Sequence, residues 1–261
     1  MAFPVTLHGP DGEQHNSYTD QRWPLGTRML LQDGRAYRFG LNGAGAATAG
    51  ILFQSEVPDG NFDTQAVPSS TVNTAGNYTI RATLSANAIV VNLFAEGYAV
   101  TEAAAGAGEG YAYKITSHPL SAGTEDVTFN IATPLKHTLN TSDKVTLIRH
   151  PGAQVIIHPA PRTANLFGVA AGAIAAASYG WFAVEGPQPV LVVGTHVIGG
   201  GLAATGTVTG SPDGSVEAIG VLVTTTAATI AQTTEFMGSY VGNAIEVAPT
   251  TGYGLADLKM S

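Results

Sequence analysis

RMLLQDGRAYRF, residues 28–39, is the stretch that decides the fold class of this chain. β-prone residues fill Arg28–Gln32 and again Arg35–Phe39, and Asp33-Gly34 separates the two runs. A two-residue connection of this kind favours a type I′ turn, in which both central residues take positive φ. The stretch therefore predicts a β-hairpin with its turn at Asp33 and Gly34.

Alternation of apolar and polar residues extends this pattern along the chain. In Asn77–Leu84, for example, Tyr78, Ile80, Ala82 and Leu84 alternate with more polar residues, which places one side of the segment on a core. Further strands are expected at Ala88–Phe94, Asp126–Ile131, Lys144–Arg149, Gln154–His158, Trp181–Glu185, Pro189–Val193, Gly206–Thr209, Ser215–Thr225 and Ala244–Val247.

Glycine and proline separate these segments. The chain has 32 Gly and 14 Pro, spread along its length as in a protein of many short strands joined by turns. Turns are expected at Gly186-Pro187 and Asp213-Gly214. Residues 96–99 and 109–112 both carry the sequence Glu-Gly-Tyr-Ala, and the Gly/Ala-rich residues between them predict two strands joined by a loop.

Asn165–Ala177 fits helix or strand. Its alanines favour helix, whereas Gly168 and Gly172 oppose it, and we expect two short strands. The predicted fold is all-β: a β-sandwich or β-barrel-like body of many short antiparallel strands with little helix.

The expected organisation has three parts. Residues 1–27 show no periodicity and predict an extended N-terminal arm. Residues 28–158 and 162–261 predict two β-rich domains with a break near Pro159–Pro161, or one domain formed by both.

Composition narrows the classes of function. Charged residues make up 11% of the chain, against ~25% in an average domain. The net charge of −8 argues against a nucleic-acid partner, which would need clustered Lys and Arg. No apolar stretch reaches the roughly 18 residues of a membrane span, and no signal peptide is visible, so no membrane partner is expected.

The motif search nominates no catalytic residue, cofactor or metal site. None of the seven histidines is paired at metal-ligand spacing. His150 and His158 flank an expected hairpin at residues 151–153 and could meet across strands, although two turn or surface histidines fit as well. No phosphate-binding loop and no nucleophile elbow occur. We expect a protein that is not an enzyme.

The two tryptophans, Trp23 and Trp181, allow two interpretations. Large aromatic residues usually fill β cores. Alternatively, Trp23 anchors the arm in a partner's pocket, since tryptophan is a frequent interface anchor. In that case Tyr18, Arg22 and Pro24 are the neighbouring candidate interface residues.

Several blocks of the chain resemble virion structural proteins of tailed bacteriophages and, more loosely, their head decoration proteins. The most distinctive block contains Tyr179, Gly180, Trp181 and Gly186, and another contains Asp33 and Gly34. The blocks are residues 25–28, 31–39, 49–54, 109–118, 179–187, 190–194 and 199–202.

The resemblance implies a structural virion protein, made late in infection in the host cytoplasm. Such a protein lies on the outer surface of the capsid, binds the major capsid protein and stabilises the shell, often as a homotrimer. The chain is longer than the smallest decoration proteins of this kind.

Two alternatives remain open at this point. A phage tail component, or another virion structural protein, would have a similar composition. A carbohydrate-binding β protein could stack its aromatic residues on sugars, although no carboxylate pair for glycoside hydrolysis can be nominated.

Overall fold

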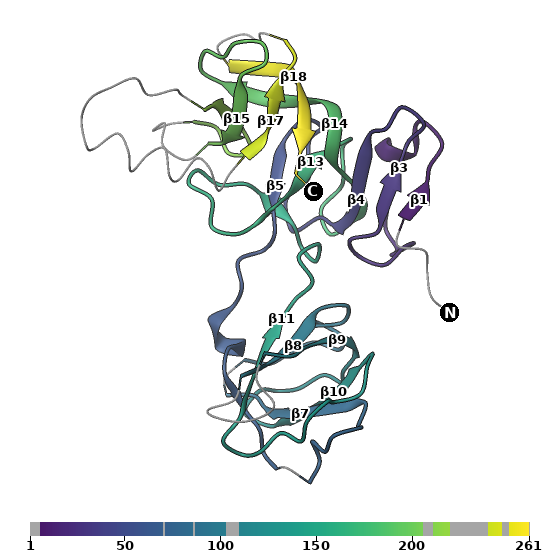
Figure 1. The fold of residues 1–261 in the computed structure, drawn as a ribbon, viewed down its shortest axis with the longest axis vertical. Helices are drawn as coiled ribbons and strands as arrows, with labels where there is room; N and C mark the ends of the chain where they lie inside the picture. The colour runs from purple at the N-terminus through teal and green to yellow at the C-terminus, as the bar shows by residue number, and fades with distance from the viewer. Residues whose placement is uncertain are drawn as a thin grey trace, which may run out of the picture. The chain divides into compact units, whose positions relative to one another are not determined.

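The computed structural model of the chain describes residues 6–69, 71–85, 87–102, 110–205, 211–219, 240–246 and 251–260. Its regular structure within these ranges is β-strand, apart from two single turns of 3-10 helix, η1 (Glu13–His15) and η2 (Gly60–Phe62). The predicted all-β fold class is confirmed. The chain forms two compact units, unit 1 from Met1–Val57 with Pro151–Ser261, and unit 2 from Pro58–His150 (Figure 1).

Unit 1 is built on the 15-residue strand β14 (Tyr179–Val193). The first part of β14 pairs with β4, β2 and β13, and the second part with β18 and β16. The other strands of unit 1 are β1 (Thr6–His8), β2 (Ser17–Tyr18), β3 (Arg28–Leu30), β4 (Ala36–Leu41), β5 (Leu52–Gln54), β12 (Ile156–Ile157), β13 (Leu166–Ala170), β15 (Gly201–Ala204), β16 (Val216–Ala218), β17 (Tyr240–Ala244) and β18 (Thr251–Lys259).

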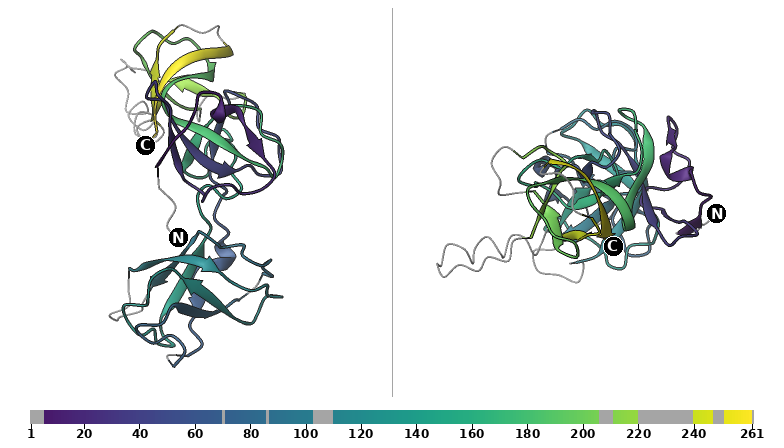
Figure 2. Two further views of the ribbon diagram at one scale, coloured as in Figure 1. Left: turned by 90° about the vertical axis from the view of Figure 1, so that its right-hand side faces the viewer. Right: turned by 90° about the horizontal axis from the view of Figure 1, so that it is seen from above.

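The pairings of unit 1 form one large sheet that closes on itself at one end. The order β1-β3-β4-β14-β16-β15-β17-β18 returns to β14 through the β14–β18 ladder, so five strands form a ring (Figure 2). Most pairs are antiparallel, as predicted, but β1–β3 and β14–β16 are parallel. Alternation along β4 and β14 sends Phe39 and Trp181 to one core cluster and Phe182 to another, which also contains Phe53 and Phe167.

Unit 2 is a closed antiparallel barrel with its own core. Its strands are β6 (Gln65–Ala66), β7 (Thr79–Thr83), β8 (Tyr98–Glu102), β9 (Ala112–Ser117), β10 (Asp126–Ile131) and β11 (Lys144–Ile148), in the order β10-β7-β6-β11-β8-β9. The core cluster of unit 2 includes Ile80, Phe94, Phe129 and Val145. The predicted pair of strands around the Gly/Ala-rich segment is confirmed, because β8 pairs with β9.

The predicted domain boundaries are wrong. The chain leaves unit 1 after Val57 and returns to it at Pro151, and no unit boundary falls at Pro159–Pro161. The reason is that β5 pairs with both β12 and β13, which joins the segments before and after the inserted barrel in one sheet.

The hairpin at residues 28–39 is confirmed, but its turn differs from the predicted type I′. The Gly34 N–H donates to the Leu31 carbonyl at 3.1 Å, and only Gly34 of the central pair has positive φ (+88°). The Asp33 carboxylate accepts a bond from the Arg35 N–H at 3.1 Å. This geometry is a type I turn followed by a left-handed glycine, which suits a β-hairpin.

Two other local predictions are also wrong. Gly186-Pro187 is no turn, because β14 runs through it, with Gly186 at φ +88° and a register shift against β4 between Ala183 and Glu185. Ala88–Phe94 is no strand, because only Ile89 makes an isolated bridge and turns follow it. The predicted strand Gly206–Thr209, most of Ser215–Thr225 and the last residue of Ala244–Val247 lie outside the described residues.

Candidate functional site

Five aromatic side chains of unit 1 meet in one cluster, here called the aromatic cluster: Tyr18, Trp23, Phe39, Tyr179 and Trp181. The Trp23 ring centre lies 5.2 Å from that of Trp181, 5.2 Å from that of Phe39 and 5.6 Å from that of Tyr18. Tyr179 stacks on Phe39 at 5.7 Å. Phe39 and Trp181 are fully buried, while the other three rings are half-buried. Phe39 and Trp181 therefore belong to the unit 1 core, and the other three rings pack against it.

Strand pairing explains why these residues meet. In the β14–β4 pairing, Trp181 lies opposite Phe39. In the β14–β2 pairing, Tyr179 lies opposite Tyr18. The aromatic cluster thus brings together Tyr18 and Trp23, which are predicted interface residues, with Tyr179 and Trp181, which belong to the most distinctive sequence block. Gly180 lies between the two block aromatics, and the side chain of Ile174 occupies the space that a side chain at Gly180 would need.

A carboxylate holds the N-terminal segment on the aromatic cluster. Glu13 accepts hydrogen bonds from the Tyr18 hydroxyl, from the Trp181 indole Nε1–H at 3.3 Å and from the Asn16 amide at 2.9 Å. Burial, and then the bond to Glu13, raise the pKa of Tyr18. These contacts fix η1 and β2 to the body of unit 1.

The predicted extended arm is therefore corrected for the described residues 6–27. Here β1 pairs with β3, and the His15 ring lies 2.9 Å from the Ala171 carbonyl. The Trp23 ring packs on Phe39 and Trp181 of its own unit, as the core-filling interpretation expects, and Trp181 is fully buried there. The segment packs on its own unit and does not extend as an arm because burying its apolar side chains there removes them from water.

Arg22 and Pro24 flank Trp23 in different roles. The exposed Arg22 guanidinium lies 4.2 Å above the Tyr18 ring centre, a cation–π contact. The Pro24 carbonyl accepts bonds from the Thr27 N–H at 3.2 Å and the Thr27 hydroxyl at 2.7 Å, which forms the turn into β3. Of the four predicted interface residues, Arg22 is exposed and the other three are half-buried.

Asp33, Gly34 and Gly186 belong to another part of unit 1. Hydrogen bonds from the Arg35 backbone and side chain lower the pKa of Asp33, and Arg35 also pairs with Asp11 at 3.3 Å. A Cβ at Gly186 would lie 3.1 Å from the Arg35 side chain. Asp33 and Gly34 shape the turn through bonds to Arg35 and Leu31, and Gly186 lies within β14.

The two histidines expected to flank a hairpin belong to different units. His150 ends unit 2, whereas His158 is buried in unit 1 with its Nε2 3.0 Å from the Thr205 carbonyl. Within the described part of the chain, no group of three or more His, Cys, Asp or Glu is placed to hold a metal ion.

Unit 2 carries an apolar surface that the sequence analysis missed. Val90, Val91 and Leu120 are 67%, 60% and 72% exposed. The Ile89–Ser121 bridge buries those two residues and turns the neighbouring Val90 and Leu120 outward on the same face. We call these three residues the barrel patch. The apolar run Ala88–Phe94 was its only signal in the sequence, and it was assigned to a strand.

His118 holds the barrel patch in place. Its Nε2 accepts a bond from the Phe94 N–H at 2.9 Å, and its Nδ1 lies 2.7 Å from the Pro119 carbonyl. The backbone N–H of His118 donates to the Asn92 side-chain oxygen at 3.0 Å. Burial lowers the pKa of His118, partly offset by the Pro119 carbonyl. A neutral imidazole therefore ties the segment that carries Val90 and Val91 to the segment that carries Leu120.

Comparisons with known proteins return no relative. No family model matches the chain, and neither a curated protein nor a solved structure matches it. In the described residues, no helix is long and apolar enough to cross a membrane.

Proposed function

We propose that this chain is a structural virion protein that binds the outer surface of a tailed-phage capsid and stabilises the shell. The observation that carries the proposal is the barrel patch, since Val90, Val91 and Leu120 stay at least 60% exposed on a unit that has its own buried core. Grouped exposed apolar residues are typical of protein–protein contact sites. The virion setting comes from the sequence resemblance alone.

The proposed partner is the major capsid protein, and the occupant of the barrel patch is a surface of that protein. Burying an aliphatic side chain of this size contributes about 1.5–3 kcal/mol. One such contact is weak, but a homotrimer on a repeating lattice would engage several at once and raise the overall affinity. Binding only the expanded shell would stabilise that state by differential affinity.

Co-sedimentation with isolated expanded heads that lack this protein tests the proposal. We expect binding that saturates at a fixed ratio to the capsid protein. The double variant Val90→Ser/Leu120→Ser should bind at least about a hundredfold more weakly, because each of the two lost contacts costs about 1.5 kcal/mol or more. The matched control is Val197→Ser/Ile198→Ser, which alters two unit 1 residues that are each 68% exposed.

Each outcome decides a different point. Failure of the wild-type protein to bind heads overturns the capsid proposal, and binding to isolated tails instead would assign it to the tail. Saturable binding that both double variants retain would keep the capsid role and exclude the barrel patch as the contact. Light scattering of the free protein tests the proposed homotrimer.

The aromatic cluster supports a second candidate function, carbohydrate binding. The rings of Tyr18, Trp23 and Tyr179 are half-buried, and the Tyr18 hydroxyl donates to the Glu13 carboxylate. Sugars bind aromatic faces flanked by polar groups. A glycan array with the wild-type protein and the Tyr179→Ala variant tests this function. Silence of the wild-type protein on the array would remove it.

A further inference from the structure

β3 and β4 place two arginines directly opposite each other. Arg28 and Arg38 are paired in antiparallel register. The Leu31 N–H donates to the Arg35 carbonyl at 3.0 Å, so the alternation of the ladder leaves Arg28 and Arg38 between hydrogen-bonded pairs. Opposing side chains are closest at such positions, with Cβ atoms about 4.5–5.5 Å apart, and like charges there are destabilising.

One carboxylate partly compensates this pair of cations. Glu185 of β14 pairs with the Nη2 of Arg28. The Arg28 Nε is buried without a hydrogen-bond partner. The Arg38 guanidinium makes no hydrogen bond or ion pair with any residue that the structure describes. Burial, and then the charge of Arg28, lower the pKa of Arg38, in agreement with a cation that lacks an anion.

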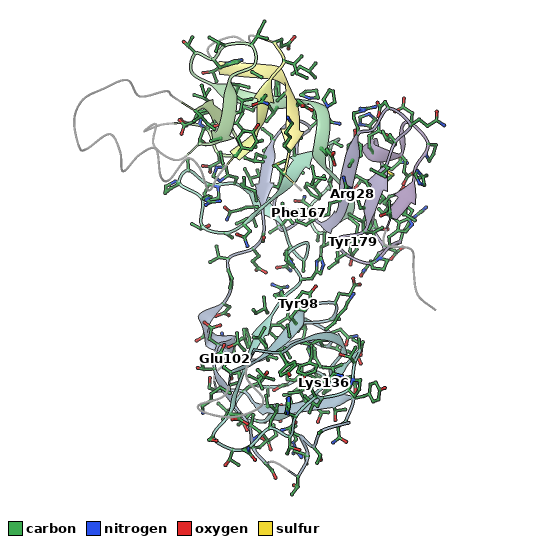
Figure 3. The ribbon with its side chains drawn as sticks, in the orientation of Figure 1. Arg28, Tyr98, Glu102, Lys136, Phe167 and Tyr179 are labelled. Carbon is green, nitrogen blue, oxygen red and sulfur yellow. The ribbon has the colours of Figure 1, made fainter. Side chains whose placement is uncertain are left out.

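An aromatic ring holds Arg38 in this arrangement. The Arg38 guanidinium carbon lies 5.6 Å from the centre of the Phe167 ring. The Phe167 ring occupies the space over Gly40, where a Cβ would lie 2.7 Å from the ring. Gly40 and Arg38 are two residues apart on β4, so they share a face of the sheet. The Phe167 ring packed over Gly40 therefore also supports the Arg38 side chain. Figure 3 labels Arg28 and Phe167 in unit 1.

We propose that Arg28 and Arg38 form a binding site for an oxyanion, the carboxylate or phosphate group of a partner molecule. The Arg28 side chain, which is 42% exposed, and the planar fork of Arg38 supply N–H donors that match two oxygens of one such group. The bound oxyanion screens the two like charges from each other, while Glu185 keeps its bond to Nη2. This site is independent of the barrel patch and of the proposed capsid role.

Titration of the full chain with inorganic phosphate, sulfate and acetate, each against chloride at matched ionic strength, tests the site. The first readout is the set of arginine Nε–H signals in the NMR spectrum. We expect saturable shifts of the Arg28 and Arg38 signals and little change at Arg22. A response to acetate alone identifies a carboxylate as the ligand group, whereas a response to phosphate and sulfate identifies a tetrahedral oxyanion.

Thermal unfolding of matched variants gives the second readout. The preferred oxyanion should raise the Tm of the wild-type protein and of Arg22→Gln, because Arg22 also lies over an aromatic ring but has no opposing arginine. The Tm of Arg38→Gln should rise less, because only the non-specific effect of the salt on stability remains. Equal Tm shifts in all three proteins, or no saturable shift of the Arg28 and Arg38 signals, would overturn the proposal. If Arg38→Gln does not fold, the wild-type NMR titration decides alone.

Discussion

Gly186 shows how one residue controls the longest strand of the molecule. Its φ of +88° lies in the left-handed region, and a Cβ there would lie 3.1–3.2 Å from Arg35. The residue lets β14 change partners from β4 to β18 without ending. A side chain at this position would oppose both the backbone conformation and the packing.

The variant Gly186→Ala should lower the free energy of unfolding by about 1–3 kcal/mol, because left-handed backbone is strained for alanine. Gly34→Ala is the matched control, since Gly34 has the same φ but open space around it. Urea denaturation of both variants separates the strain from the contact with Arg35. Equal losses in the two variants would show that the contact contributes nothing.

Trp23 gives the second prediction at this scale. Truncation of a fully buried aromatic residue to alanine costs about 3–5 kcal/mol, so Trp23→Ala at this half-buried position should cost about 2–3 kcal/mol. Arg22→Ala, which removes an exposed cation–π contact, should cost less than about 1 kcal/mol. The measurement is chemical denaturation followed by the fluorescence of Trp181. A Trp23→Ala variant as stable as the wild type would restore the free-arm interpretation.

At the scale of single elements, the sequence predicts some strands well for a clear reason. Asp126–Ile131 is a strand with the predicted bounds, because its polar and apolar residues alternate strictly and one face is buried. Ala88–Phe94 fails because its apolar residues do not all enter the core, and Val90 and Val91 remain on the surface. The strand β14 was divided in two because Gly-Pro usually marks a turn, whereas here the prolines lie along the β18 pairing.

The segment tied by His118 should respond to pH. The pKa of His118 is lowered below its ordinary value of 6.5, so the unfolded chain takes up this proton at a higher pH than the folded chain does. The stabilisation by neutral His118 is therefore complete above about pH 6.5 and is lost as the pH falls from there toward the folded pKa. The slope reaches at most about 1.4 kcal/mol per pH unit for one group.

Denaturation at several pH values in the wild type and in His118→Gln tests this sign. We expect a shallower pH dependence in His118→Gln. His158, whose pKa is also lowered by burial, should contribute a second loss in unit 1 over the same range. A His118→Gln variant with the full wild-type slope would contradict the assignment.

At the scale of the whole molecule, the interrupted unit could not be read from the sequence. Local alternation identifies strands but not which distant strands pair, and β5 finds its partners about a hundred residues later. The aromatic cluster could not be predicted for the same reason, because it depends on which strands pair. The sequence singled out Tyr18, Trp23, Tyr179 and Trp181 separately, and only the pairing of β14 with β2 and β4 shows that they form one cluster.

The division into units predicts how fragments behave. Residues 58–150 expressed alone should fold, because the barrel is closed and has its own core. Residues 151–261 alone should not fold cooperatively, because β14 would lose β4 and β13 would lose β5. Calorimetry and NMR spectra of both fragments test this. A folded 151–261 fragment would show that the N-terminal strands are dispensable.

The insertion of the barrel between β5 and β12 also has a mechanical consequence. These strands are antiparallel neighbours, with Gln54 opposite Ile156, so both connections leave from the same end of one short ladder. A tensile load on unit 2 would pull both strands in the same direction and would not shear one against the other. The load would pass instead to the ladder between β5 and β13. A single proteolytic cut in either connection would leave the barrel attached by the other.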